Sequence, residues 1–176
     1  MKTSLNYALK YGAVAGVIMI VSWFVSHQLF TSEDGSFDSS MGEFLGYAAM
    51  ILAFTMVFLG VKNYRDREGA GHITFGKAFL IGLYIVLVTS VIYVVGWMIY
   101  YPNFMADFPD QYLQSQLAQL KESGLSETEI QTKKEELIGW MEWYKEPQNM
   151  AAMTFMEIFP VGLIVTVISA FIWKKK

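Results

Sequence analysis

The chain has 176 residues, of which 54% are hydrophobic and only 16% are charged. Soluble domains usually carry about 25% charged residues, so this composition points to a membrane. The net charge of −3 argues against nucleic acid as a partner, because binding it needs a basic surface, and the lack of cysteine excludes disulfides, thiolate metal sites and thiol nucleophiles.

Four apolar runs are long enough to cross a bilayer, whose hydrocarbon core needs about 20 residues of helix. They are apolar on all sides, whereas a core helix of a soluble protein would carry a polar stripe. A signal peptide is the alternative for the first run, but this run is longer than a typical h-region and no small-residue cleavage site follows it. We therefore expect transmembrane helices over about residues 8–30, 43–62, 76–101 and 150–173.

Lysine and arginine are unevenly distributed between the two sides of these spans. The dense group, Lys62, Arg65, Arg67 and Lys77, lies between the second and third spans, and further lysines flank both termini. On the opposite side, segment 31–43 holds neither residue type and segment 102–149 holds four lysines. Because cytoplasmic segments are enriched in Lys and Arg, we expect both termini and a basic anchor on the cytoplasmic side. The alternative role of these four cations is to bind anionic lipid head groups.

The segment between the third and fourth spans is long enough to fold outside the membrane. Asp110 can cap a first helix, which Gly124 can end. Ser126 and Glu129 form the S-x-x-E pattern of a capping box for a second helix. We expect an outer helical hairpin over residues 110–146, which either packs on the bundle, binds a partner or gates a substrate.

Glu157 is the ionisable residue of the fourth apolar run. A carboxylate inside a membrane is costly and by default suggests a function. Since His27 and Glu43 are expected on the same membrane side, the three residues form a candidate intramembrane polar cluster for a proton or a cation. The alternative is that Glu157 faces the outer hairpin and water, or bonds to a neighbour such as Thr154 or a tyrosine. Two acids and one histidine are too few to name a metal, and we predict no metal, cofactor or catalytic residue.

Glycine pairs in the first two spans indicate close helix packing. Gly12 with Gly16, and Gly42 with Gly46, have the G-x-x-x-G spacing that lets two helices approach closely. The contact can lie within the chain or between two copies of it.

Residues 58–101 read FLGVKNYRDREGAGHITFGKAFLIGLYIVLVTSVIYVVGWMIYY. This stretch resembles the central signature of a family of small four-helix bacterial inner-membrane proteins, frequent in Bacteroidota, that is catalogued as a domain of unknown function. FLGVKNYRD, GHITFGKAF and a C-terminal WKKK stand where that family has similar motifs, over nearly the whole chain. The resemblance implies the architecture and the inner-membrane location, and no catalytic residue or ligand. It also implies a structured entry into the third span, with Thr74 at the N-cap or just before it and Gly76 in close packing of the turn.

The predicted fold class is all-α, as one integral membrane domain over residues 1–176. It is a four-helix bundle with an extracytoplasmic two-helix hairpin between the third and fourth spans. We expect a non-enzymatic accessory or scaffold subunit that contacts the lipid bilayer and either another membrane protein or a second copy. The alternative is a small oligomeric transporter or channel that handles ions at Glu157. An accessory protein should tolerate Glu157→Gln, and an ion-handling one should not.

Overall fold

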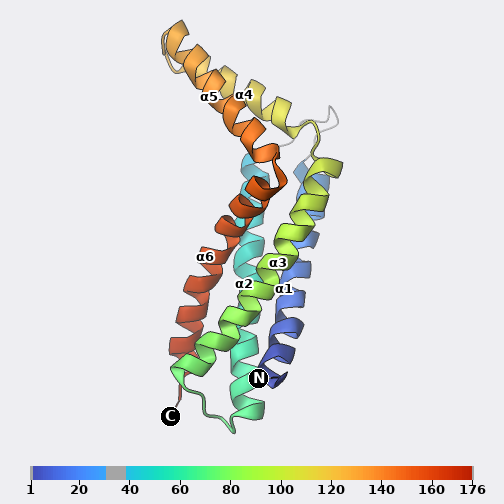
Figure 1. Cartoon of the computed structure of the whole chain (residues 1–176), viewed down its shortest axis with the longest axis vertical. Helices are drawn as coiled ribbons and strands as arrows, with labels where there is room; N and C mark the ends of the chain where they lie inside the picture. The colour runs from blue at the N-terminus through green and yellow to red at the C-terminus, as the bar shows by residue number, and fades with distance from the viewer. Residues whose placement is uncertain (1, 31–38, 176) are drawn as a thin grey trace. The chain divides into compact units, whose positions relative to one another are not determined.

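The computed structural model describes residues 2–30 and 39–175 of the chain (Figure 1). Within these residues the regular structure is helical, apart from one isolated bridge between Ile73 and Lys175. The helices are α1 Lys2–Phe30, α2 Ser39–Glu68, α3 Phe75–Phe104, α4 Phe108–Glu122, α5 Glu127–Lys145 and α6 Pro147–Trp173.

Four of the helices are long and apolar enough to cross a membrane. Their candidate spans are Thr3–Phe30 in α1, Phe44–Glu68 in α2, Phe75–Phe104 in α3 and Pro147–Trp173 in α6. The predicted all-α membrane fold is therefore confirmed. The helices run past the apolar runs, because helical hydrogen bonding continues through polar residues, as at 62–68 of α2.

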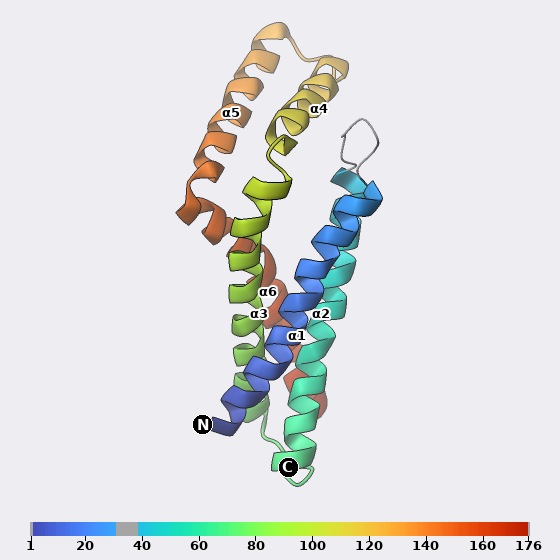
Figure 2. The same cartoon turned by 90° about the vertical axis from the view of Figure 1, so that its right-hand side faces the viewer.

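The helices form two compact units. Unit 1 comprises Met1–Gly96 and Thr154–Lys176, and unit 2 comprises Trp97–Met153. The boundary falls inside α3 and α6, so each of these helices contributes to both units. In unit 1, α1, α2 and the corresponding parts of α3 and α6 run side by side, and both ends of the chain lie at the same end of this unit (Figures 1 and 2).

Glycines create the contact between α1 and α3 in unit 1. A Cβ atom added to Gly12 would lie 2.7 Å from Val88, and one added to Gly16 would lie 2.6 Å from Ile92. Such distances leave no room for a side chain, so this G-x-x-x-G pair packs within the chain. At Gly46, by contrast, no described atom lies within 4 Å of an added Cβ.

Glycines also bring α3 and α6 together. A Cβ added to Gly82 would lie 2.8 Å from the methyl group of Thr166, and one added to Gly162 would lie 2.5 Å from Val86. From Gly82 to Val86 in α3 the chain advances by one turn, while the partners in α6 step back by one turn from Thr166 to Gly162. The two helices are antiparallel and meet through small residues, which is how membrane helices gain van der Waals contact.

The entry into α3 is capped by Thr74, as predicted. The Thr74 hydroxyl accepts a hydrogen bond of 3.3 Å from the backbone N–H of Lys77, and its carbonyl accepts one of 3.0 Å from Ala78. The expectation for Gly76 is wrong, because no described atom lies within 4 Å of a Cβ added there.

The start of α4 in unit 2 differs from the prediction. The N-cap is Asp107, whose side chain makes no capping hydrogen bond, and Asp110 lies inside the first turn. Pro109 explains the difference, since proline fits the first turn of a helix, where its missing N–H would have no partner. Asp110 instead places its negative charge near the positive end of the helix dipole.

The turn between α4 and α5 and the start of α5 follow the predicted pattern. Gly124 has a φ of 73°, the left-handed conformation that glycine adopts readily at a helix end. Ser126 and Glu129 form a complete capping box: the Ser126 hydroxyl accepts from the Glu129 N–H, and the Glu129 carboxylate accepts from the Ser126 N–H.

Candidate functional site

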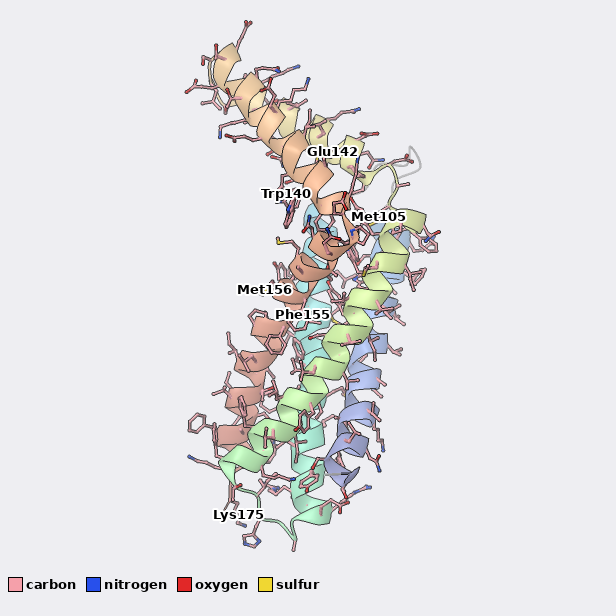
Figure 3. The ribbon with its side chains drawn as sticks, viewed as in Figure 1. Met105, Trp140, Glu142, Phe155, Met156 and Lys175 are labelled. Carbon is pink, nitrogen blue, oxygen red and sulfur yellow. The ribbon has the colours of Figure 1, made fainter. Side chains whose placement is uncertain are left out.

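Glu157 lies on the exposed side of α6, inside the candidate span. At 1.5 Å per residue it is about 15 Å along the helix from Pro147. Phe155 and Met156 precede it on the same turn (Figure 3), and the Met156 side chain is exposed. The carboxylate is therefore at the periphery of unit 1 and is flanked by apolar side chains.

A buried tyrosine donates a hydrogen bond to this carboxylate. The hydroxyl of Tyr93, in α3, lies 3.5 Å from Oε1 of Glu157. The antiparallel packing of α3 and α6 brings the two residues to the same level. The Tyr93 ring packs against Trp23 of α1, with ring centres 4.9 Å apart. Helices α1, α3 and α6 thus meet beside this carboxylate. The phenol hydroxyl can stabilise either form of it, as a donor to the charged carboxylate or as an acceptor from the protonated one.

The sequence allowed a tyrosine partner for Glu157 but did not single out Tyr93, because an aromatic residue in an apolar run looks like a packing residue. His27 follows Trp23 by one turn of α1 and is half-buried. Glu43 belongs to α2, and its side chain lies outside the part of the chain that the structure describes. The cluster of Glu157, Glu43 and His27 therefore stays a prediction. Within residues 2–30 and 39–175, no group of three or more His, Cys, Asp or Glu side chains could hold a metal ion.

The predicted basic anchor lies at the end of unit 1 that holds both chain termini. Hydrogen bonds connect the elements there: the Tyr7 hydroxyl of α1 donates to Glu68 of α2 at 3.3 Å. Ile73 before α3 and Lys175 after α6 pair through their backbones. We call this region the basic end, and its described cations are Lys10, Lys62, Arg65, Arg67, Lys77, Lys174 and Lys175.

Aromatic rings accompany the cations of the basic end. The Arg65 guanidinium lies 4.7 Å from the centre of the Trp173 ring, and the Lys77 ammonium lies 5.4 Å from that of Tyr64. Cations stack on aromatic faces because the ring carries negative charge density above its plane. Trp173 is a residue that sequence analysis did not single out, although its position next to the terminal lysines was a signal.

An aromatic cluster in unit 2 connects the end of α5 to the end of α3. The Trp97 indole donates a hydrogen bond of 2.9 Å to the Tyr144 hydroxyl. The Tyr144 ring stacks on Trp140, at 5.4 Å and 13°, and meets the edge of Tyr101 at 5.7 Å. These contacts hold the C-terminal half of α5 in a defined orientation within unit 2.

Next to this cluster, α5 exposes large apolar surface. Trp140 is 48% exposed and Trp143 is 45% exposed, one turn apart on the same side of the helix. Within the described residues of α4 and α5, none is buried. The hairpin therefore pairs its two helices but leaves two tryptophans open to another surface.

The start of α5 holds a carboxylate with a shifted pKa. The Ser126 hydroxyl donates to the Glu129 carboxylate at 2.7 Å, and the Ser126 N–H donates to it at 2.9 Å. Both bonds stabilise the ionised form, so they lower the pKa of Glu129 below its ordinary value. This carboxylate has a structural role at the helix end.

Comparison with known proteins identifies the family. The family model described as "Protein of unknown function (DUF4199)" matches residues 10–175. The chain belongs to this family. The DUF4199 match covers all four candidate spans almost completely and confirms the expected membership of a family of unknown function. No curated protein and no solved structure matches the chain.

Membership in DUF4199 and the four apolar helices together describe a multi-pass membrane protein. The family description supplies no activity, and three features of the structure bear on the function. These are the Tyr93–Glu157 pair, the basic end, and the exposed pair Trp140 and Trp143.

Proposed function

We propose that this protein is a non-enzymatic accessory or scaffold subunit that binds another membrane protein through its α4–α5 hairpin. The observation that supports this most is the exposure of Trp140 and Trp143. Tryptophan is the residue most enriched in the energetically important centres of protein interfaces. Stacking of Trp140 on Tyr144 orders the surface before binding, which lowers the entropy cost of association.

The charge of the hairpin suggests what kind of surface the partner offers. Acidic side chains outnumber basic ones on α4 and α5, and the basic ones are Lys121, Lys133, Lys134 and Lys145. A complementary partner would present an apolar pocket for Trp140 and Trp143 with basic residues around it. Complementary charge at the rim speeds encounter, and the buried tryptophans supply the affinity.

We also propose that the basic end faces the cytoplasm across a bacterial inner membrane, with the hairpin on the other side. The excess of Lys and Arg at this end supports the orientation. The partner contact would then be extracytoplasmic.

Photocrosslinking in native membranes tests the accessory function. A photoreactive phenylalanine analogue at position 143 should form an adduct with one membrane protein, and the analogue at the exposed position 114 of α4 should not. The captured protein is then purified and its affinity for the full-length chain is measured. Trp140→Ala with Trp143→Ala should weaken binding about tenfold or more, whereas Gln114→Ala with Gln119→Ala should not change it.

Three results would contradict the accessory function. These are adducts with lipid only, adducts only with a second copy of this chain, and unchanged affinity in the double tryptophan variant. The first would assign Trp140 and Trp143 to the membrane interface, where tryptophan is also enriched.

The competing function is a small oligomeric transporter or channel. It is favoured by one observation, the hydrogen bond from Tyr93 to Glu157 within two candidate spans. In an oligomer, a neighbouring copy of the chain would cover this exposed carboxylate. The carboxylate would then lie along an ion path between the two copies. Ion flux into liposomes that Glu157→Gln abolishes would establish this function in place of the first.

A further inference from the structure

The basic end carries more positive charge than its own carboxylates can neutralise. The acidic residues among its cations are Asp66 and Glu68, both near the end of α2. Glu68 accepts the hydrogen bond from Tyr7, and Asp66 accepts from both Lys62 and Arg65. The positive charge left over is spread over the ends of four helices in one compact unit.

One face of this end combines the cations with an indole. The Arg65 guanidinium lies 4.7 Å and the Lys62 ammonium 5.8 Å from the centre of the Trp173 ring. The same two side chains share the Asp66 carboxylate, at 2.7 Å for Arg65 and 3.1 Å for Lys62. α2 therefore holds two cations side by side over the last residue of α6, with one negative charge between them.

Donor groups remain available at this face. The Lys62 side chain is 43% exposed and uses one of three possible hydrogen-bond donors on Asp66. The Arg65 side chain is only 18% exposed, so it is held in place by the ring and the carboxylate. A face with two ordered cations and one acid favours an anion with several oxygen atoms.

Exposed apolar side chains lie directly beside these cations. Leu59 precedes Lys62 by one turn of α2 and is 44% exposed, and Phe171 and Ile172 at the end of α6 are also exposed. Both helices are candidate membrane spans, so this apolar surface is where acyl chains would lie. The ligand that fits both parts has an anionic head and a hydrocarbon tail.

We propose that Lys62 and Arg65, held over Trp173, bind the phosphate of an anionic phospholipid. The other cations of the basic end attract the negatively charged membrane surface, and this pair selects a head group at a defined place. The aromatic ring orients the guanidinium so that its free N–H groups face the phosphate, and the acyl chains follow Leu59.

Quenching of tryptophan fluorescence by brominated lipids tests this site. The chain has five tryptophans, and only Trp173 belongs to the basic end, so the other four are replaced by phenylalanine. The protein is placed in phosphatidylcholine vesicles that contain a fixed fraction of brominated phosphatidylglycerol or brominated phosphatidylcholine. A local preference of about fivefold for the anionic lipid is expected from one net positive charge at the membrane surface.

Two double variants that lose the same charge distinguish a defined lipid site from a general electrostatic attraction to the membrane surface. Lys62→Gln with Arg65→Gln should abolish the preference for phosphatidylglycerol. Lys10→Gln with Arg67→Gln removes as much charge from the same end without touching Trp173, and should leave most of the preference. Equal effects of the two double variants would overturn the proposal, and so would equal quenching by the two lipids in the parent protein.

Addition of inorganic phosphate to protein in neutral detergent tells a lipid from a free anion. Phosphate should leave Trp173 emission unchanged. A saturable change in Trp173 emission as large as the change that phosphatidylglycerol causes would contradict a lipid site. If the single-tryptophan protein does not fold, native mass spectrometry of the original chain measures the same preference. Phosphatidylglycerol should then remain bound to the original chain and be lost from the Lys62→Gln, Arg65→Gln variant, and retention by this variant would contradict the site.

Discussion

Ile73 and Lys175 exchange two backbone hydrogen bonds, although one precedes α3 and the other follows α6. The Ile73 N–H lies 3.0 Å from the Lys175 carbonyl oxygen, and the Lys175 N–H lies 2.9 Å from the Ile73 carbonyl oxygen. Ile73 is buried, and Lys175 lies beyond the last turn of α6 (Figure 3). This pair continues the antiparallel packing of α3 and α6 past the ends of both helices and ties the C-terminus to the α2–α3 turn.

Lys175→Pro should loosen this connection. Proline has no backbone N–H, so one of the two hydrogen bonds is lost. We expect amide hydrogen exchange at Ile73 to become about fivefold faster, the effect of one backbone hydrogen bond. Lys175→Gln is the control, because it removes the same charge and keeps the N–H. Equal exchange rates in the two variants would show that the pairing contributes nothing to local stability.

Gly12→Ala should destabilise unit 1. The added Cβ would lie 2.7 Å from Val88 and 2.9 Å from the carbonyl oxygen of Ile85, and a backbone atom cannot turn away as a side chain can. Overpacking of this kind costs about 1–3 kcal/mol, measurable as a lower midpoint of unfolding in detergent. Gly46→Ala is the matched control, with no described atom near the new Cβ. It should be neutral or slightly stabilising, because alanine favours helix more than glycine does.

Ser126→Ala should fray the first turn of α5. The bond from the Glu129 N–H to the Ser126 hydroxyl is lost, and we expect the protection of the Glu129 amide from hydrogen exchange to fall about fivefold. Ser115→Ala, at an exposed position within α4, should leave that protection unchanged. Unchanged protection in the Ser126 variant would contradict a stabilising cap.

The same cap predicts how the stability of α5 depends on pH. The pKa of Glu129 is lowered by its bonds from Ser126, so folding favours the ionised form. The stabilisation is complete above the unfolded pKa and is lost as the pH falls through the lower folded pKa, below about 4. Amide protection at the start of α5, measured relative to Ser126→Ala at each pH, should decline in this range. An unchanged ratio from neutral to acidic pH would contradict this assignment.

Glu157→Gln should preserve partner binding if the protein is an accessory subunit. The carboxylate is on the exposed side of α6, and glutamine can still accept a hydrogen bond from Tyr93. Affinity for the partner captured at position 143 should stay within about twofold, since conservative changes outside an interface centre cost little. Tyr93→Phe is the companion variant, which removes the donor instead. A tenfold loss of affinity in Glu157→Gln would place this carboxylate in the interface.

Single cysteines should report the orientation in the membrane. The native chain has no cysteine, so each label has one target. His72→Cys, in the exposed turn between α2 and α3, should react with an impermeant maleimide only after the inner membrane is opened. Gln119→Cys, exposed on α4, should react in intact spheroplasts. The reverse pattern would overturn the proposed cytoplasmic location of the basic end.

Much of the architecture follows from local sequence alone. Four apolar runs determine four long helices, because a backbone in lipid must satisfy its own hydrogen bonds. Ser126 with Glu129, and Gly124, determine the helix boundaries in the hairpin, because capping and left-handed turns depend only on neighbouring residues. The prediction for Asp110 was wrong for the same local reason, since Pro109 is accommodated inside the first turn.

Tertiary structure alone decided which residues from distant helices meet. No spacing in the sequence connects Tyr93 to Glu157, Arg65 to Trp173, or Trp97 to Tyr144. An aromatic residue in an apolar run gives the same sequence pattern whether its side chain faces lipid, another helix or a charged group. The sequence determined that Gly12 and Gly46 can each admit a close neighbour. Gly12 of α1 packs closely against α3, whereas Gly46 of α2 has no described atom near it, because contact between helices depends on how they are arranged around each other in three dimensions.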